Sequence, residues 1–429
     1  MRYTLPSLVM LVCIGAATTS AQSSAAATPD YRSRAVSKSD GSVRVSTAVL
    51  SAKESELLYG VPLADKRIQP VWIEVENKGS ESVWLMSPGV DPNFFPPSEA
   101  AEAFSAKADK QALVDRETRF RALAFRNPVP PGGTVSGFVL TNLLEGAKLV
   151  QIDLFGNQSS HTFSIVTTVP GLRADYEQSQ VFLRETYTAG QIVNFTDDAA
   201  FRAALEQLPC CVTNKGGDKT GDPLNLIVVG GIDDAFPSFV RRGWSLTEAT
   251  WSGAITRMVT SALAGERYPY APVSNLFLLG RQQDIALQKA RDTIHQRNHL
   301  RLWKSPLQYH GKSVWIGQIS RDIGSRLTIH SPTLTTHKID PDVDKAVMAL
   351  LTDLMYSQNL QKFAFVKGVG AATKDNPRRN LTTDPWYTNG LRVVLFFDRV
   401  PTSMADIEIL PWETTREGLI DASLTERKP

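Results

Sequence analysis

Polar and apolar residues alternate at every second position in short segments between residues 43 and 171. A strand with one buried face shows this alternation because successive side chains point to opposite faces. Gly, Pro and Asn separate the segments and indicate tight turns. The expected strands are residues 43–50, 70–77, 82–87, 134–140, 148–156 and 161–169. We therefore predict an immunoglobulin-like β-sandwich over residues 43–171, with one helical insertion over 98–112.

The pattern changes after a connector over residues 172–221, in which DAAFRAALEQL has helical periodicity. Apolar runs typical of buried strands then alternate with helical segments. The expected strands are 224–231, 274–280 and 391–398 with a hairpin over 312–329, and the expected helices are 233–243, 251–264 and 341–359. Because several strands follow one another without regular helical crossovers, residues 222–400 are predicted to form a mixed α+β sheet domain, followed by a tail over 401–429.

The N-terminal residues have the pattern of a secretory signal. One Arg precedes an apolar run over residues 5–17, and small residues follow as far as Ala21. The run is shorter than the roughly 20 residues that a membrane-spanning helix needs, and no later segment is longer. We therefore expect a signal peptide over 1–21, export to the periplasm or out of the cell, and no transmembrane segment in the mature chain. Residues 22–42 lack apolar periodicity and predict a disordered leader.

Composition is that of an ordinary globular protein and argues against nucleic acid as a partner. The length of 429 residues suits two domains, because single cores stop growing at roughly 250 to 300 residues. Hydrophobic residues make up 42% of the chain and the formal net charge is +2 at pH 7. So small a charge gives no general electrostatic attraction to nucleic acid.

Three cysteines are present, and Cys13 would be lost with the signal peptide, which leaves Cys210 and Cys211. Adjacent Cα atoms lie about 3.8 Å apart, closer than most disulfides prefer. Two half-buried thiols or a single bridge between neighbours both fit this spacing, and both are favoured over a redox site. Because there is no second cysteine pair, a structural zinc site with thiolate ligands is excluded.

The segment RNHLRLW, residues 297–303, carries the main candidate chemistry. On a strand, Arg297, His299, Arg301 and Trp303 would share one face because side chains alternate. Guanidinium groups bind phosphate or carboxylate with two parallel hydrogen bonds. An imidazole between two cations has its charged form disfavoured, so it stays available as a base or a hydrogen-bond acceptor.

Three further residues could join this face. Arg281 follows the strand FLLG, Asp322 lies in the segment SRDIG and His337 precedes KIDP. If the sheet brings them together, Asp322 could orient an imidazole, as acid–base sites require. The alternative interpretation is a solvated strand face on which arginines and aspartates pair, because structural ion-pair networks gather the same residue types.

Other segments do not carry the function that they suggest at first. DPDVD, residues 340–344, has acids at alternate positions like a calcium loop, but Lys345 stands where that loop requires Gly. Asp340 suits a helix N-cap and Pro341 the first helical position. LIVVGGIDD and GVGAAT lack residues that phosphate-binding loops require, so we expect no nucleotide cofactor. No histidine pair has the spacing of a metal motif, and we expect no metal.

An ordered series of motifs resembles the LssY C-terminal domain family over about residues 222–400. The motifs are DPLNLIVVG, RRGW, YAPVSNLFLLGRQQDIALQK, RNHLRLW, VWIGQISRDIG, THKIDPDVD and TNGLRVVL. The resemblance implies a domain that occurs alone in secreted or envelope proteins, or behind membrane segments resembling DedA and type 2 phosphatidic acid phosphatases. The sequence lacks the lysine, arginine and histidine signature of that phosphatase, so the resemblance does not carry its activity over. The N-terminal β-module resembles an immunoglobulin-like companion of such domains.

These observations predict an exported cell-envelope protein. We expect its C-terminal domain to bind an anionic, phosphate-bearing ligand such as a lipid headgroup through Arg281, Arg301 and His299, with Trp303 as an apolar wall. A second hypothesis is a hydrolase that uses His299 and His337 as acid and base, with Asp322 orienting one imidazole. A third is a non-catalytic scaffold whose β-domain binds an envelope protein, which an exposed apolar patch there would favour. The sequence alone does not decide whether the chain is an enzyme.

Overall fold

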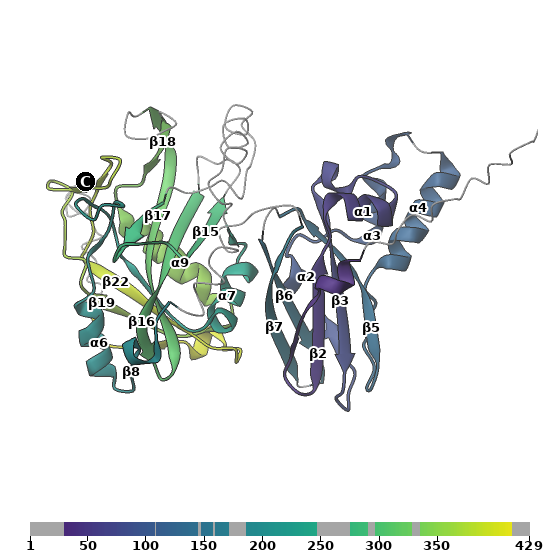
Figure 1. The fold of residues 1–429 in the computed structure, drawn as a ribbon, viewed down its shortest axis with the longest axis horizontal. Helices are drawn as coiled ribbons and strands as arrows, with labels where there is room; N and C mark the ends of the chain where they lie inside the picture. The colour runs from purple at the N-terminus through teal and green to yellow at the C-terminus, as the bar shows by residue number, and fades with distance from the viewer. Residues whose placement is uncertain are drawn as a thin grey trace, which may run out of the picture.

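The computed structural model describes residues 30–413 with internal gaps. The gaps are residues 108, 145–146, 158, 171–185, 247–274, 291–296 and 328–334. The expected signal peptide and the helix expected over 251–264 therefore lie outside the described residues. The two halves of the chain form separate β-rich bodies that lie next to each other (Figure 1). Within the described ranges, every helix is too short or too polar to cross a membrane.

The N-terminal half is built from two antiparallel sheets. One has the strand order β1-β2-β3-β5 and the other β4-β6-β7. Their bounds are β1 Val36–Ser39, β2 Val43–Val49, β3 Ile68–Asn77, β5 Thr134–Asn142, β4 Trp84–Leu85, β6 Ala147–Phe155 and β7 Ser160–Thr168. Each strand expected from the alternating pattern is present. The two sheets bury their apolar residues in one shared core, in which Ile73 of β3 and Ile152 of β6 are fully buried.

Helices cover the other face of the four-stranded sheet. They are α1 Ala52–Tyr59, α3 Pro97–Glu102 and α4 Lys110–Leu123, whereas the short α2 Ser87–Val90 buries Val90 in the core between the two sheets. Tyr59 of α1 and Phe120 of α4 are buried in a second core with Trp72 of β3. The single helix expected over 98–112 is instead the pair α3 and α4, separated by a 3-10 turn at Ser105–Lys107. Helix α1 was not expected, although a capping box of Ser51 and Glu54 starts it.

Residues 31–39 are ordered, which differs from the disordered leader expected over 22–42. The short 3-10 helix η1 (Tyr31–Arg34) buries the ring of Tyr31, whose centroid lies 5.4 Å from that of Phe138. Strand β1 then pairs with β2 along the edge of the sheet. A single aromatic residue in a Ser-rich segment produces no periodicity. The pattern of the sequence therefore missed a strand that pairing with β2 stabilises.

Ten strands of the described C-terminal residues form one mixed sheet. The order is β12-β15-β16-β17-β11-β22-β19-β23, with β8 beside β16 and β18 beside β17. The bounds are β8 Val193–Phe195, β11 Leu226–Val229, β12 Ser245–Leu246, β15 Ile285–Ala290, β16 Arg297–Tyr309, β17 Lys312–Leu327, β18 Thr335–Ile339, β19 Leu360–Lys367, β22 Leu391–Phe397 and β23 Glu408–Ile409. Strand β11 pairs parallel with β22 and antiparallel with β17. The predicted mixed α+β architecture is confirmed.

Helices pack on both faces of this sheet. Helix α7 (Ile232–Arg241) and helix α9 (Val343–Met355) cover one face and bury Phe239 and Leu350. Helix α6 (Asp198–Glu206) lies on the opposite face and buries Phe201 in the same core cluster as Trp303 of β16. A small sheet of order β10-β9-β13-β14 adjoins α6. Its bounds are β9 Cys211–Thr213, β10 Thr220–Pro223, β13 Phe277–Leu278 and β14 Arg281–Gln282.

Arg392 of β22 fastens α6 to the large sheet. Its side chain is completely buried and donates hydrogen bonds to five backbone carbonyl oxygens. The acceptors are the carbonyl groups of Leu205, Leu208, Pro209, Leu224 and Gly368, at 2.6–3.0 Å. The last carbonyls of a helix have no partner within the helix, so the guanidinium of Arg392 satisfies them from outside. The C-terminal end of α6 is therefore held by a strand that is distant in sequence.

The hairpin expected over 312–329 is instead one long strand, β17. The tight turn comes earlier, at His310 and Gly311, whose φ angles of 47° and 78° are both left-handed. Two left-handed residues make the turn that fits the twist of a two-residue hairpin. The segment SRDIG lies inside β17, where the pairing with β18 shifts register between Asp322 and Gly324. The polar residues of this segment led to the prediction of a turn, although they lie in the middle of a strand.

The start of α9 also differs from the prediction. Asp342 occupies the N-cap position, and Asp340 accepts a hydrogen bond from the backbone N–H of Asp342 at 3.1 Å. Asp344 turns inward and accepts hydrogen bonds from Thr388 Oγ1 at 2.6 Å and from the backbone N–H of Asn389 at 2.7 Å. These acids therefore build the helix start and clamp a neighbouring loop. Burial raises the pKa of the Asp344 carboxyl.

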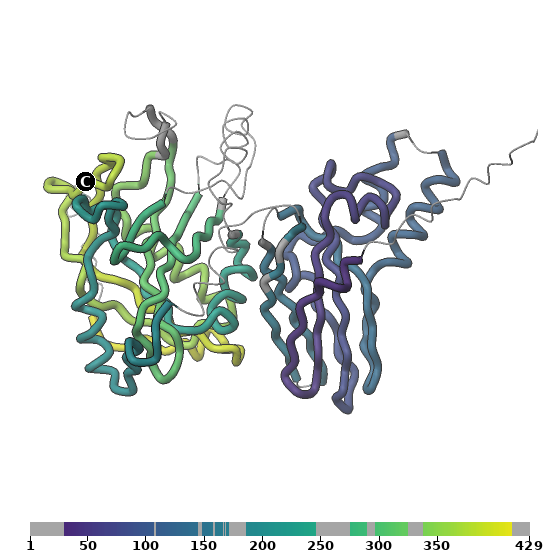
Figure 2. The backbone as a smooth tube through the Cα atoms, in the orientation of Figure 1, coloured from purple at the N-terminus to yellow at the C-terminus, as the bar shows by residue number. Residues whose placement is uncertain are grey.

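The two halves of the chain meet where α7 packs against β6 and β7 (Figure 2). Arg241 of α7 donates to both carboxylate oxygens of Asp153 in β6, at 2.8 and 3.3 Å. The Nη1 atom of the same guanidinium donates to the carbonyl oxygen of Ser357 at 3.0 Å. Lys38 of β1 forms a second ion pair across the boundary with Asp233 of α7. These charged contacts join the N-terminal half to the C-terminal half.

Candidate functional site

Strand β16 places Arg297, His299 and Arg301 on one face of the large sheet. On the neighbouring strand β17, Ser320 is opposite His299 and Gln318 is opposite Arg301. We call these five residues with Gln288 of β15 and Asp322 of β17 the Arg–His cluster. All seven are buried; Arg297 and Arg301 are each 4% exposed and His299 is 7% exposed. The expected sharing of one strand face is thus seen, but the face lies inside the protein.

The hydrogen bonds of His299 define its tautomer. The guanidinium nitrogen Nη1 of Arg301 lies 3.2 Å from His299 Nδ1, and a guanidinium can only donate. Nδ1 is therefore the acceptor, and Nε2 carries the proton that it donates to Asp322 Oδ1 at 2.9 Å. Ser320 Oγ lies 3.3 Å from the same Nε2. Both ring nitrogens are thus engaged by neighbouring side chains.

Burial lowers the pKa of His299 below its usual value, because the charged imidazolium loses its hydration. The positive charges of Arg301 and Arg297 lower this pKa further. The carboxylate of Asp322 acts in the opposite direction by its charge and its hydrogen bond. The balance favours a neutral imidazole between two guanidinium groups, as the sequence pattern predicted.

Asp322 connects the two basic groups nearest to it. Arg297 donates from Nε to Asp322 Oδ2 at 2.9 Å, while His299 occupies Oδ1. Arg297 also donates from Nη1 to Gln288 Oε1 at 2.6 Å. Arg301 donates to Gln318 Oε1 at 2.8 Å, and burial lowers the pKa of Arg301 to about 10. A single buried carboxylate therefore serves one guanidinium and one imidazole.

A second carboxyl group approaches the cluster from the small sheet. Asp222 of β10 is 7% exposed, and Asn380 donates to its Oδ1 at 3.4 Å. Burial raises the pKa of Asp222, while the charges of Arg301 and His299 oppose this shift. The charges of Asp222 and Asp322 both act on the buried guanidinium of Arg301.

Arg281 and Trp303 do not join the cluster, contrary to the prediction. Arg281 donates to both carboxylate oxygens of Asp284, at 3.2 and 3.1 Å, and to the carbonyl oxygen of Lys304. Trp303 is 1% exposed in the core beneath α6, and its Nε1 donates to the carbonyl oxygen of Arg281. Arg281 thus belongs to the small sheet and its own ion pair. Trp303 packs as a core residue instead of lining a site.

His337 can be located only by its backbone. It lies in β18 opposite Ser325 of β17, and its side chain lies outside the described residues. The hypothesis that His299 and His337 act as acid and base therefore depends on a side chain outside the described residues. Among the described side chains, His, Cys, Asp and Glu form no group of three that could hold a metal ion.

Four residues that lie in or next to the Arg–His cluster were not predicted from the sequence. Gln288, Gln318 and Ser320 surround the imidazole, and Asp222 approaches from a strand that precedes them all. A signal was present for two of them, because Gln318, Ser320 and Asp322 occupy alternate positions of one segment. The assumption of a hairpin over this segment hid that alternation. No local pattern indicated Asp222 or Gln288.

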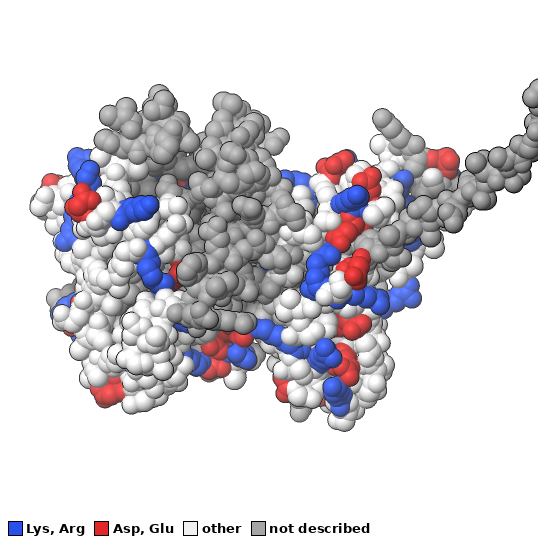
Figure 3. All heavy atoms as spheres, viewed as in Figure 1, with Lys and Arg blue, Asp and Glu red and all other residues white. Residues whose placement is uncertain are grey.

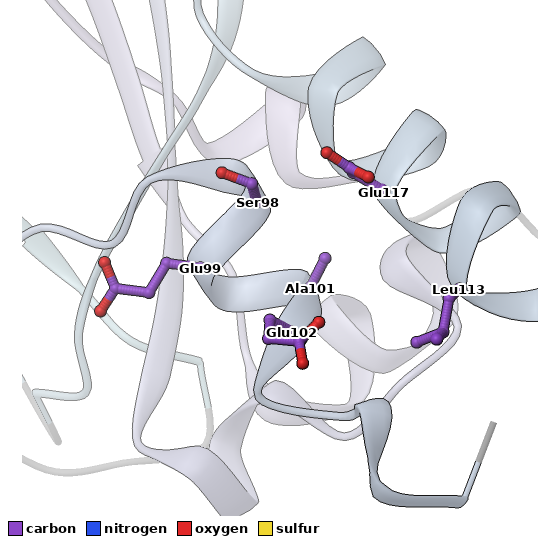
Figure 4. Close-up of a pocket in the computed structure, with 6 residues that line it drawn as sticks. All are labelled: Ser98, Glu99, Ala101, Glu102, Leu113 and Glu117. Carbon is purple, nitrogen blue, oxygen red and sulfur yellow. The ribbon is translucent and has the colours of Figure 1, made fainter. Parts of the chain in front are cut away.

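Two cavities in the described part lie away from the cluster. One, of about 420 Å³, lies between α3 and α4 (Figure 4). Three of its lining residues are glutamates, so it is unsuited to an anion: they are Glu99, Glu102 and Glu117. The other, of about 510 Å³, lies at the boundary of the two halves beside Lys38 and Asp233. On the visible surface, positive and negative side chains are interspersed (Figure 3).

Comparison with known protein families identifies the C-terminal region of the chain. Residues 202–391 match the family described as LssY C-terminus. The matched region begins inside α6, earlier than the resemblance seen in the sequence, and contains the whole Arg–His cluster with Asp222. No curated protein matches the chain. The C-terminal domain of this chain therefore belongs to the LssY C-terminus family.

Proposed function

We propose that this chain is an exported cell-envelope protein whose C-terminal domain binds an anionic, phosphate-bearing ligand at the Arg–His cluster. The observation that supports this proposal is the pair of buried guanidinium groups on either side of a neutral imidazole. Removing a guanidinium from water costs several kcal/mol unless negative charge compensates for it. The carboxylate of Asp322 supplies such charge to Arg297. A phosphate oxygen is an acceptor of the same kind.

The donor chemistry of the cluster suits phosphate. Each guanidinium has five N–H donors in a planar fork, so it can serve a protein acceptor and a ligand oxygen together. Arg301 and Arg297 come from the same strand face, with Ser320 and Gln318 as neutral polar neighbours. A lipid headgroup and free phosphate share this chemistry. The leader of the sequence, with its expected signal peptide, is the reason for placing the protein outside the cytoplasm.

The engagement of both ring nitrogens of His299 favours binding over hydrolysis. A general base needs a lone pair directed at the proton that it removes. Here Nδ1 already accepts from Arg301 and Nε2 donates to Asp322. An acid–base role would require one of these bonds to break. Binding requires no such rearrangement.

We also propose that the N-terminal half is an immunoglobulin-like β-sandwich. Two antiparallel sheets share one core of valine, isoleucine and leucine residues, which supports this assignment. In cell-surface proteins such a domain presents one of its faces to a partner. The helices α1, α3 and α4 cover one outer face of this half, and α7 of the C-terminal half packs against part of the three-stranded sheet.

A scaffold function is supported by an exposed apolar patch on that sheet. The rings of Trp84 and Phe155 stack with their centroids 5.8 Å apart and remain 38% and 46% exposed. Met86 beside them is 43% exposed. Exposed apolar clusters of this kind often mark protein contacts. Trp84→Ser should abolish cross-linking of the exported chain to an envelope protein, whereas Leu57→Ser, at an exposed residue of α1, should leave it unchanged.

The ligand proposal is tested with inorganic phosphate and with vesicles of phosphatidylglycerol or phosphatidylcholine. Arg301→Gln should weaken binding to the active probe about tenfold or more, because a charge-assisted hydrogen bond is lost. Arg281→Gln serves as the control, since Arg281 lies in a separate ion pair. If the chain binds both inorganic phosphate and phosphatidylglycerol vesicles, the site recognises the phosphate group itself. If it binds only the vesicles, the site recognises a lipid headgroup. Equal binding by both variants would contradict the proposal.

A further inference from the structure

The adjacent residues Cys210 and Cys211 are joined by a disulfide. They lie between α6 and β9, where the chain enters the small sheet. Cys211 packs in an apolar cluster with Trp386, Val369 and Val343, and Cys210 packs against the margin of this cluster. The disulfide thus has one sulfur in the interior and one nearer the surface.

The two sulfurs differ in their access to solvent and in their charge environment. Cys211 is 5% exposed, whereas Cys210 is only half-buried. Nη1 of Arg378 lies 3.8 Å from the sulfur of Cys211 and donates towards it. Arg378 is held there by the carbonyl oxygen of Val369 at 3.1 Å and by the ring of Trp386, 5.5 Å from the guanidinium carbon. A fixed positive charge therefore faces the buried sulfur.

We propose that Cys210–Cys211 is a redox site that undergoes thiol–disulfide exchange with an external dithiol. A thiolate of the dithiol attacks the accessible sulfur of Cys210, and the bond between the two cysteine sulfurs breaks. The electron pair of that bond passes to the sulfur of Cys211, which leaves as a thiolate beside the guanidinium of Arg378. A leaving thiolate that is stabilised by positive charge departs faster.

The second thiolate of the external dithiol then completes the exchange. It attacks the sulfur of its own molecule in the mixed disulfide and releases Cys210 as a thiolate. Each cysteine thiolate released in the exchange is protonated to a thiol when the pH lies below its pKa. The cysteine pair gains two electrons, and the external dithiol loses two and becomes a disulfide. The reaction is therefore balanced without another oxidant or reductant.

The surrounding backbone lets the pair open without unfolding the domain. Arg392 holds the carbonyl groups of Leu208 and Pro209 just before the pair. The carbonyl oxygen of Cys210 accepts from the N–H of Leu224 at 2.8 Å, and Cys211 pairs with Pro223. These anchors on both sides confine the change to the two cysteines and the facing residues of β10. Asp222, which borders the Arg–His cluster, is the neighbour of Pro223 in that strand.

The redox state is measured on the tryptic peptide of residues 203–215, which contains both cysteines. In the full chain, isolated without reductant, this peptide should lack the mass of two hydrogen atoms. Treatment of the native chain with dithiothreitol should restore this mass and allow two alkylations. A pair that is already reduced in the isolated chain, or that resists dithiothreitol until denaturant is added, would overturn the proposal.

The role of Arg378 is tested by the rate of reduction in the native chain. Arg378→Gln should slow reduction several-fold, because the leaving thiolate loses its positive neighbour. Arg379→Gln is the matched control: Arg379 donates to the carbonyl oxygen of Thr383 and makes no described contact with sulfur. Circular dichroism establishes that both variants are folded. Equal rates for the two variants would refute the assigned leaving group.

A trapping experiment distinguishes the two sulfurs. In Cys211→Ser, the remaining Cys210 thiol should form a mixed disulfide with an aromatic disulfide reagent within the native fold. In Cys210→Ser, the buried Cys211 thiol should react much more slowly. The reverse order would show that the wrong sulfur has been assigned as the point of attack. None of these readouts depends on ligand binding at the Arg–His cluster.

Discussion

His299 and Asp322 are joined across the pair of strands β16 and β17 by a hydrogen bond of 2.9 Å, in which both partners are buried. The same carboxylate receives the guanidinium of Arg297. This one acid therefore compensates a cation and orients an imidazole. Its removal leaves both groups without their described negative partner in a region from which water is largely excluded.

Asp322→Asn should lower the free energy of unfolding by about 3–5 kcal/mol, the usual cost of breaking a buried ion pair from one side. The amide keeps the shape of the side chain and removes its charge. Urea unfolding measures the change. Asp340→Asn, at a half-buried acid before α9, should cost less than about 1 kcal/mol. A small effect at position 322 would mean that other groups compensate the two basic side chains.

The stability of the C-terminal domain should fall in mild acid because of His299. Its pKa in the folded state lies below the unfolded value of about 6.5, so the unfolded chain binds the proton more readily. The stability contribution is complete above pH 6.5 and is lost as the pH falls below it. His299→Gln should remove this dependence, as urea midpoints at about pH 7.5 and pH 5 would show. An identical acid dependence in the variant would assign the effect to other groups.

Lys148 should give the N-terminal half a pH dependence of the same sign, but in the alkaline range. Its side chain is 1% exposed and donates to the carbonyl oxygen of Asn142 at 2.8 Å and to Gln69 Oε1 at 3.2 Å. Burial lowers the pKa of Lys148 to about 8, while the charge of Asp91 opposes the shift.

Between pH 8 and about 10.5 the unfolded chain holds this proton and the folded chain has released it. Stability therefore rises with pH, by up to about 3 kcal/mol over the whole interval. Lys148→Met should flatten the rise in urea unfolding measured from about pH 7 to pH 10. A wild-type chain that loses stability over this interval, with a flat variant, would reverse the predicted sign.

Arg241→Gln should loosen the contact between the two halves of the chain. The guanidinium loses a two-point hydrogen bond to Asp153 across the boundary. A double-mutant cycle with Asp153→Asn should give a coupling energy of about 1–3 kcal/mol. Arg242→Gln is the matched control, because Arg242 pairs with Asp353 within the C-terminal domain. Small-angle scattering should show a larger radius for Arg241→Gln alone.

Gly137→Ala should destabilise the N-terminal half by about 1–3 kcal/mol through crowding. A Cβ atom at Gly137 would lie 2.5 Å from the backbone N and Cα atoms of Phe125, and backbone cannot move aside cheaply. Gly190→Ala is the control, because a Cβ atom there would meet nothing within 4 Å. Thermal unfolding compares the two. Equal melting temperatures would mean that the segment before β5 shifts without cost.

Alternation in the sequence was sufficient to predict the shared face of Arg297, His299 and Arg301. It could not show that this face is buried, since burial depends on what packs over the sheet. The alternation also led to the wrong prediction that Trp303 lines the ligand site. A residue on the same strand face can still pack in a different part of the core. The prediction for Arg281 was wrong because its strand belongs to the small sheet. Local periodicity does not reveal which sheet a strand joins.

Local patterns also failed where pairing or capping decides the structure. Strand β1 exists because β2 offers a free edge, although its own residues are mostly exposed. Helix α1 has a capping box and a terminal Gly60 with φ of 74°, signals that the short apolar pattern obscured. The adjacency of Cys210 and Cys211 was visible, but their bonding was not. Asp222 reaches the cluster only through the packing of two sheets.

The contacts of Arg392 limit how short a gene fragment can be and still encode an intact C-terminal domain. Because its guanidinium binds the carbonyl groups at the end of α6, a gene fragment that began at β10 would encode a buried cation without most of its acceptors. The smallest portion that can move intact between proteins by recombination must therefore include α6.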